Sequence, residues 1–155
     1  MQNDYTKVNS KAWDKWAEEG FEWTVPITSE EYKKARSGEW RVYLTPCKPV
    51  PEAWFGDIFR GGRLLGLASG GGQQMPIFAA LGANVTVLDY SERQLASERI
   101  VAEREGYAIN IVKADMTQRL PFEDGAFDVI FHPVSNCYIE DVQHVQYIAT
   151  RAVKR

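Results

Sequence analysis

The residues whose types and spacing could do chemistry are a run of three glycines, Gly70 to Gly72, and an acid that follows them, Asp89. The glycines end a short apolar run, residues 64–68, and precede a segment with helical spacing. A glycine-rich turn between a strand and a helix lets the backbone approach a ligand at the carboxyl edge of a sheet. A carboxylate about 20 residues further on can accept hydrogen bonds from both hydroxyls of a ribose. The spacing therefore predicts a pocket for a nucleoside cofactor.

A second acid and two neighbouring residues extend this pocket. Asp115 ends the third apolar run as Asp89 ends the second, so both carboxylates are expected at the same edge of the sheet. Tyr90 and Met116 each follow one of these acids, and a flat base could stack between them. Each position also has an ordinary interpretation: the acids could cap a helix or close a turn, and Tyr90 and Met116 could belong to the core.

The elements that must position these residues follow from apolar periodicity and capping patterns. Strands are expected over residues 64–68, 85–88, 109–114 and 127–131, and helices over 8–19, 28–38, 75–81, 91–105 and 141–152. Strands that alternate with helices form a parallel sheet with helices on both faces. The sequence thus predicts an α/β fold, a Rossmann-like and mostly parallel sheet.

The first 60 residues differ from the rest because they contain all five tryptophans. Thr28 and Glu31 have the spacing of a capping box that opens a helix, and the proline-rich residues 45–51 suit a linker or a docking loop. We therefore expect an aromatic-rich, helical N-terminal cap over residues 1–60 and a cofactor-binding core over residues 61–155. The tryptophans either pack the cap onto the core or also contact a substrate.

Composition argues against several classes of protein. The net charge is -3 and no basic stripe is present, so nucleic acid is not an expected partner. The sequence has no apolar stretch of about 18 residues and no leader, which predicts a cytoplasmic protein with no membrane contact. Cys47 and Cys137 are far apart and lack metal-ligand spacing, so we expect neither a disulfide nor a bound metal.

Four stretches together resemble the class I S-adenosylmethionine-dependent methyltransferases, particularly those that act on small molecules. The stretches are residues 64–72 (LLGLASGGG), 85–91 (VTVLDYS), 113–116 (KADM) and 120–130 (LPFEDGAFDVI), and the resemblance covers residues 63–155. It implies S-adenosylmethionine as the cofactor, a small-molecule methyl acceptor, and direct in-line transfer of the methyl group. A dehydrogenase fits less well, because the third glycine of its GxGxxG motif would fall at Met75.

The resemblance also implies roles for single residues. In this family the glycine turn wraps the methionine part of the cofactor, the acid after the second strand binds the ribose hydroxyls, and the acid after the third strand meets the adenine amino group. The expected cofactor-binding residues are therefore Ala68, Ser69, Gly70, Gly72, Asp89, Tyr90, Asp115 and Met116.

Two positions depart from the family pattern. Gly66 stands where the first strand usually carries an acid, and Ala68 stands where the first glycine usually lies. Contacts to the methionine amino group are then expected to pass to Ser69, to backbone carbonyls or to water. His132 follows the fourth strand, where the family places the substrate, and is the candidate base if the acceptor must lose a proton. A histidine at a strand end is more often structural.

The family's sheet has seven strands, and this sequence supplies four of them. The C-terminal part of the sheet is therefore expected to be missing, and the chain to be a fragment or a domain completed by another chain. An unpaired edge of the fourth strand would favour self-association. The alternative function is a cofactor-binding module that does not transfer a methyl group, or one that a partner chain completes.

Overall fold

A computed structural model of the protein describes residues 4–44 and 47–139, which form a four-stranded, fully parallel sheet in the order β3-β2-β1-β4. The strands are β1 (Arg63–Leu67), β2 (Asn84–Asp89), β3 (Asn110–Lys113) and β4 (Val129–Phe131). The helices are α1 (Tyr5–Glu19), α2 (Ser29–Arg36), α3 (Gln74–Ala80) and α4 (Glu92–Glu105), with short 3-10 helices η1 (Glu22–Thr24), η2 (Glu52–Trp54) and η3 (Ser135–Tyr138). The predicted α/β, Rossmann-like fold is confirmed.

The predicted elements within the described residues are found in order, with different ends: β1 begins and ends one residue earlier than predicted, and β2 is one residue longer at each end. The third strand loses one residue at each end, and the fourth begins at Val129 instead of residue 127. Asp128 explains the later start, because its carboxylate accepts hydrogen bonds from the backbone and side chain of Arg63, at 2.9 Å from the backbone nitrogen. The helix predicted over residues 141–152 lies outside the described residues.

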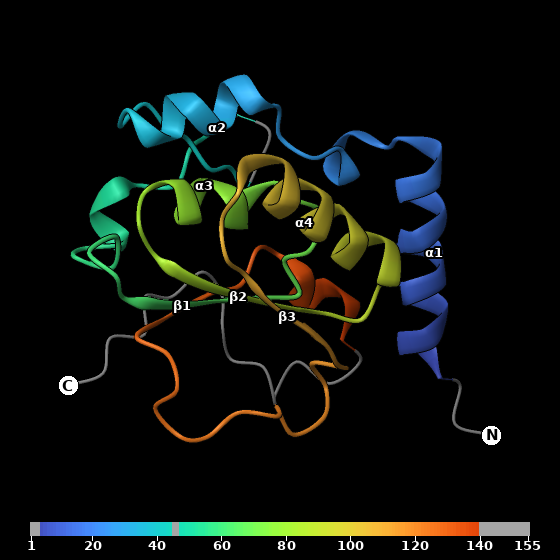
Figure 1. The fold of residues 1–155 in the computed structure, drawn as a ribbon. Coiled ribbons are helices and arrows are strands. Elements are labelled where there is room, and N and C mark those ends of the chain that lie inside the picture. Colours follow the sequence, from blue (N-terminus) through green and yellow to red (C-terminus); the bar gives the residue numbers. More distant parts are fainter. Residues whose placement is uncertain (1–3, 45–46, 140–155) are drawn as a thin grey trace.

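The order of the strands decides which face each connection covers. In the strand order, β2 lies beside β1 and β3 lies beside β2, so the connections through α3 and α4 cross the sheet in the same direction. Because such crossovers are right-handed, both helices lie on the same face of the sheet. Figure 1 shows α2, α3 and α4 together on that face and the segment 114–128 crossing the other face. On the second face, Phe122, Phe127 and their apolar neighbours pack against Leu65 and Leu88. In the described part of the chain, helices therefore cover one face and a long loop covers the other.

Residues from the predicted N-terminal cap enter the same core as the sheet. Ile27, Tyr32 and Val42 are buried in one apolar cluster together with Leu64 and Phe78. The boundary at residue 60 stays a prediction from composition, but in the structure the hydrophobic core continues across it. None of the helices within residues 4–44 and 47–139 is both long and apolar enough to span a bilayer.

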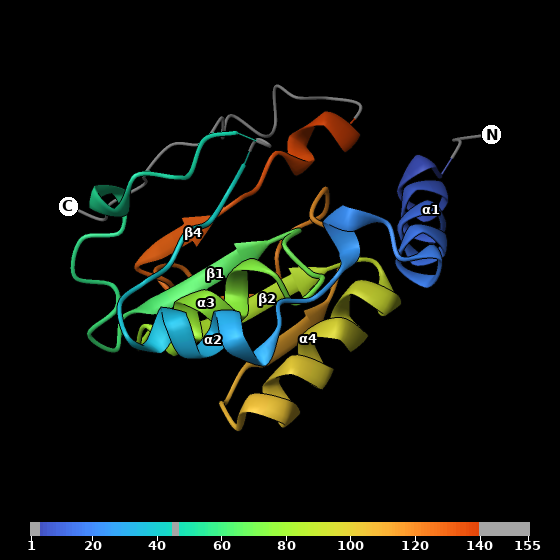
Figure 2. The same cartoon turned by 90° about the horizontal axis from the view of Figure 1, so that it is seen from above.

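Helix α1 is the exception, because none of its residues is fully buried and polar contacts attach it to the N-terminus of α4. Asp14 Oδ1 accepts hydrogen bonds from the hydroxyl of Ser91, at 2.6 Å, and from the backbone nitrogen of Arg93, at 3.0 Å. Glu18 pairs with Arg93 at 2.8 Å. An acceptor and a negative charge at a helix N-terminus complement its unpaired N–H groups and its dipole. Figure 2 shows the result: α1 stands across the carboxyl ends of the strands.

We expect Asp14→Ala to loosen α1 selectively. The variant removes the acceptor for two donors, at a cost of about 1 kcal/mol, the usual scale for a lost helix cap. Amide hydrogen exchange should become faster in α1 and stay unchanged in the sheet. Asp57→Ala is the matched control, since the Asp57 side chain is 89% exposed and pairs only at 3.8 Å with Arg60. Unchanged exchange in α1 of the Asp14 variant would show that its packing, and not this contact, holds the helix.

Candidate functional site

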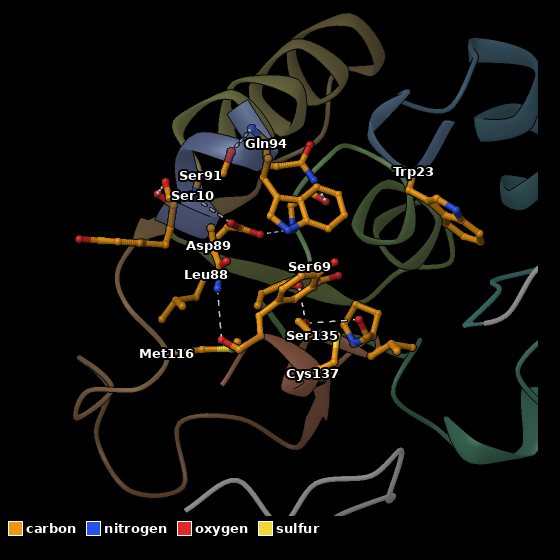
Figure 3. Close-up of a pocket in the computed structure, with 18 of the residues that line it drawn as sticks. Ser10, Trp23, Ser69, Leu88, Asp89, Ser91, Gln94, Met116, Ser135 and Cys137 are labelled. Atoms are coloured by element: carbon orange, nitrogen blue, oxygen red, sulfur yellow. Dashed lines mark hydrogen bonds between the residues drawn. The ribbon is translucent and has the colours of Figure 1, made fainter. Parts of the chain in front are cut away.

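A cavity of about 410 Å³ opens at the carboxyl ends of β1 and β2, next to the loop after β4 and beneath α1. β2 pairs with one edge of β1 and β4 pairs with the other edge, so the strand order changes direction at β1. In open parallel sheets, ligands bind in the crevice that such a switch of strand order creates. The volume lies in the range of small-molecule sites. Figure 3 shows Ser10, Asp89 and Gln94 on one side of this space, with Met116, Ser135 and Cys137 on the other.

The strand register explains why separate segments meet here. Leu67 of β1 pairs with Leu88 of β2, so the residues that follow both strands leave the sheet at the same level. Seven of the eight predicted cofactor-binding residues line the cavity, namely Ala68, Ser69, Gly70, Asp89, Tyr90, Asp115 and Met116. The structure does not place the eighth, Gly72, on the cavity wall.

Each backbone N–H group of the three glycines in the turn donates a hydrogen bond to another part of the protein. Gly70 donates to Asp89 Oδ2 at 2.9 Å, Gly71 to the carbonyl of Gln94 at 3.0 Å, and Gly72 to Glu98 Oε1 at 2.8 Å. A Cβ on Gly70 would lie 2.7 Å from Gln94 Cβ and 3.0 Å from Asp89 Oδ2. Glycine is therefore required at position 70 because Asp89 and α4 pack against this backbone, a reason that differs from the expected approach of a ligand.

Gly72 has a packing role in the structure, and its predicted contact with the cofactor stays a prediction. Its φ is +71°, in the left-handed region that favours glycine, and an added Cβ would contact Val101 and Pro26 at 3.0 and 3.1 Å. Its carbonyl accepts a hydrogen bond from Ile27 at 2.9 Å. Gly72 thus joins α4 to the N-terminal segment.

Asp89 is held in one orientation at the cavity wall. Its Oδ2 accepts from Gly70 and its Oδ1 accepts from the backbone nitrogen of Ser91, both at 2.9 Å. Burial raises the pKa of Asp89, and the backbone hydrogen bonds from Ser91, Gly70 and Tyr90 oppose that shift. Because each carboxylate oxygen has two lone pairs, both can still accept a hydrogen bond from a ligand. Asp89 thus has the capacity to receive two neighbouring hydroxyl groups.

Asp115 both closes a turn and lies at the cavity wall. Its Oδ1 closes a turn by accepting from the backbone nitrogen of Thr117 at 2.9 Å and from the Thr117 hydroxyl at 2.7 Å. The residue also lines the cavity. Its contact with the turn keeps the carboxyl group at the cavity wall.

The two departures from the family pattern have local causes. A Cβ on Gly66 would lie 2.5 Å from Met75 Sδ, so Met75 occupies the space that an acidic side chain would need. Ala68 has φ +48°, the left-handed conformation that glycine adopts readily. Val134 has φ +58° after β4, and Ser135 Oγ donates to the carbonyl of Ala68 at 2.9 Å. Strained backbone of this kind is often found at functional sites.

His132, the candidate base, is not among the residues that line the cavity, and its role in catalysis stays a prediction. The side chain is buried, and neither ring nitrogen has a hydrogen-bond partner among the described residues. Burial lowers the pKa of His132, which favours the neutral ring. The residues after it, Pro133 to Ser135, line the cavity in its place.

Sequence reasoning did not assign the aromatic wall of the cavity to particular residues. The wall contains Trp13, Trp16, Phe21, Trp23, Tyr43 and Tyr138. Trp40 instead packs edge-on against Phe55 and Phe59 beside the core, with ring centroids 5.6 and 5.5 Å apart. Trp40 therefore follows the packing interpretation, whereas Trp13, Trp16 and Trp23 line the cavity and their contact with a substrate stays a prediction.

Glu98 is a buried carboxylate that sequence reasoning missed. Its side chain is fully buried, and Oε2 has no hydrogen-bond partner within the described part of the chain. Burial, with a smaller contribution from the negative charge of Asp89, raises the pKa of Glu98 to about 8, whereas the hydrogen bond from Gly72 lowers it. Its position in the sequence indicates this burial, because Glu98 lies three residues after Leu95 and three before Val101, on the buried face of α4.

This buried acid predicts a pH dependence of stability. The pKa of Glu98 is about 8 in the folded protein and close to the ordinary 4.5 when unfolded. The folded state therefore keeps a proton that the unfolded state releases, and the free energy of unfolding should fall as pH rises from about 5 to 8, by at most about 1.4 kcal/mol per pH unit. Glu98→Gln should flatten this slope in urea unfolding, whereas Glu103→Gln, at an exposed site on the same helix, should not. Equal slopes for wild type and Glu98→Gln would mean that Glu98 is ionised in the folded protein.

The parallel sheet and the cavity at its switch point form a Rossmann-like fold, which is consistent with a class I methyltransferase. A family model described as "Methyltransferase domain" matches residues 65–155, so the chain belongs to this family of methyltransferases. The chain is also 50% identical over 147 residues to the "Uncharacterized methyltransferase YbaJ" of Bacillus subtilis (strain 168). That alignment covers 95% of this chain and 57% of YbaJ, so the chain spans little more than half the length of this curated relative.

Solved structures support the fold. YjhP from E. coli matches with a TM-score of 0.55 and 18% identity, covering 92% of this chain and 51% of that chain. A candidate S-adenosyl-L-methionine-dependent methyltransferase from Methanococcus maripaludis matches with a TM-score of 0.53 and 17% identity, covering 92% of this chain and 56% of that chain. At these identities the likeness extends to the fold alone.

Proposed function

We propose that the protein transfers a methyl group from S-adenosylmethionine to a small molecule. The observation that carries this proposal is Asp89, a carboxylate at the end of β2 whose two oxygens are oriented by Gly70 and Ser91 at the wall of the switch-point cavity. This arrangement suits the two hydroxyls of a ribose, which is the part of the cofactor that an acid in this position would hold.

The other lining residues fit the remaining parts of the cofactor. Asp115 would accept from the adenine amino group, and Tyr90 and Met116 would contact the faces of the base. Ala68, Ser69 and Gly70, in the turn after β1, would hold the methionine part. The donor set of the cavity is therefore compatible with S-adenosylmethionine.

For the proposed reaction, the main task of the protein is to position the cofactor and the acceptor. When bound, S-adenosylmethionine supplies an electrophilic methyl group, so no nucleophilic side chain is required. The protein must hold the acceptor in line with the bond that breaks and must exclude water. The aromatic wall, to which α1 and η1 contribute three tryptophans, would do both, because its rings line the same cavity. His132 is not proposed as the base, since it lies outside the cavity lining.

A cofactor-binding module without transfer activity is the second candidate. It is favoured by the edge of the described sheet, where β4 pairs with β1 and Ile130 is 39% exposed. Additional strands, from a longer protein or a partner chain, would extend the sheet there and support the acceptor side; alternatively, two copies would associate through this edge. Mass spectrometry of products from a panel of small molecules, with isotopically labelled S-adenosylmethionine and the longest natural form of the protein, separates the two functions.

Asp89→Ala should weaken binding of S-adenosylhomocysteine by about 5- to 150-fold in calorimetry. This range corresponds to about 1–3 kcal/mol for hydrogen bonds to a charged group. Asp124→Ala, at an exposed position outside the cavity, is the control and should leave the affinity unchanged. Thermal unfolding of both variants shows whether the turn at Gly70 survives. A well-folded Asp89 variant with normal affinity would place the ribose elsewhere.

A further inference from the structure

The charges at the cavity are of one sign. Among the described residues that line it, the acidic side chains are Asp89 and Asp115, and no lysine, arginine or histidine is present. Both acids stand at strand ends, where backbone N–H groups fix their orientation. An anionic ligand would therefore find negative charge and no cationic side chain to pair with it on this part of the wall.

Two basic side chains close to the cavity, Lys7 and Arg93, are already paired with acids. Lys7 of α1, whose charge interacts with the lining residue Tyr90, forms an ion pair with Asp4. Arg93, at the start of α4, pairs with Glu18 at 2.8 Å. Recruiting either cation for an anionic ligand would break an existing contact.

Another part of the cavity wall consists of aromatic rings that pack against one another. Trp13 lies edge-on to Trp16, with centroids 5.1 Å apart, and edge-on to Tyr138, with centroids 5.8 Å apart. Trp16 also contacts Phe21 at 5.6 Å. Trp16 and Phe21 remain 36% and 40% exposed, so part of their ring surface is available to a ligand. Such surfaces bind apolar molecules and, through the electron-rich ring faces, cations.

We propose that the methyl acceptor is an apolar molecule that is uncharged or cationic, and that the cavity selects against anionic acceptors. This inference rests on the proposed methyl transfer at the same cavity. Asp89 and Asp115 are assigned to the cofactor, and the aromatic wall, which the cofactor assignment does not use, receives the acceptor. An anionic acceptor would find no lysine, arginine or histidine among the described lining residues, so we expect it to bind more weakly than a neutral or cationic one.

The test uses three indoles of similar size and different charge: tryptamine, a cation, tryptophol, which is neutral, and indole-3-acetate, an anion. Their binding is measured by calorimetry on the longest natural form of the protein, saturated with S-adenosylhomocysteine. We expect tryptamine and tryptophol to bind at least tenfold more tightly than indole-3-acetate. Equal or tighter binding of indole-3-acetate overturns the proposal, and so does the absence of binding by all three. Failure to bind S-adenosylhomocysteine in the first step refutes the proposed function instead.

A matched pair of variants tests the place of binding. Trp16→Leu should weaken tryptamine and tryptophol at least fivefold while the affinity for S-adenosylhomocysteine is unchanged. Trp54→Leu is the control, because Trp54 is 37% exposed, almost the same as Trp16, and does not line the cavity. Equal effects of both variants, or no effect of Trp16→Leu, would remove the aromatic wall from acceptor binding.

Discussion

The two hydrogen bonds that Asp89 accepts, from Gly70 and from Ser91, are the contacts on which the site depends. They join the turn after β1 to the first residues of α4 across the end of β2. From Ser91 the connection continues, because its hydroxyl donates to Asp14 on α1. One continuous set of hydrogen bonds therefore sets the shape of the turn, the start of α4 and the position of the helix over the cavity. Loss of the carboxylate would leave backbone donors unpaired in a partly buried place, where each costs more than an ordinary hydrogen bond contributes.

A second buried carboxylate, that of Glu98, fixes the other end of the glycine turn. Glu98 accepts from Gly72, whose carbonyl in turn accepts from Ile27 of the N-terminal segment. Burying an acid whose second oxygen has no partner among the described residues is costly, and protonation is the way in which such a group reduces that cost. The turn is thus held between an acid that faces the cavity and an acid that faces the core. Its flexibility comes from glycine, but its conformation comes from these two acceptors.

Local rules were sufficient for most of the fold. The capping pair Thr28 and Glu31 is present with both of its reciprocal hydrogen bonds, and Ser91 caps the helix α4 that was predicted to begin there. Apolar runs predicted all four described strands in order, and only their ends differed, by one or two residues, since strand ends depend on contacts such as that between Arg63 and Asp128. These features could be predicted from the sequence because they depend on residues a few positions apart and on the apolar period of each helix or strand.

The sequence by itself determined the elements, the sheet type and the two acids at its carboxyl edge, because parallel strands joined by short helices leave one arrangement for strand-end residues. Only the tertiary structure decided that Gly70 is required by Asp89, that Gly72 packs against α4, and that His132 is buried outside the cavity lining. It likewise divided the tryptophans, placing Trp40 beside the core and Trp13 at the cavity. A cavity is the space left between elements distant in sequence, so which side chains face it depends on how those elements pack, and no local pattern carries that information.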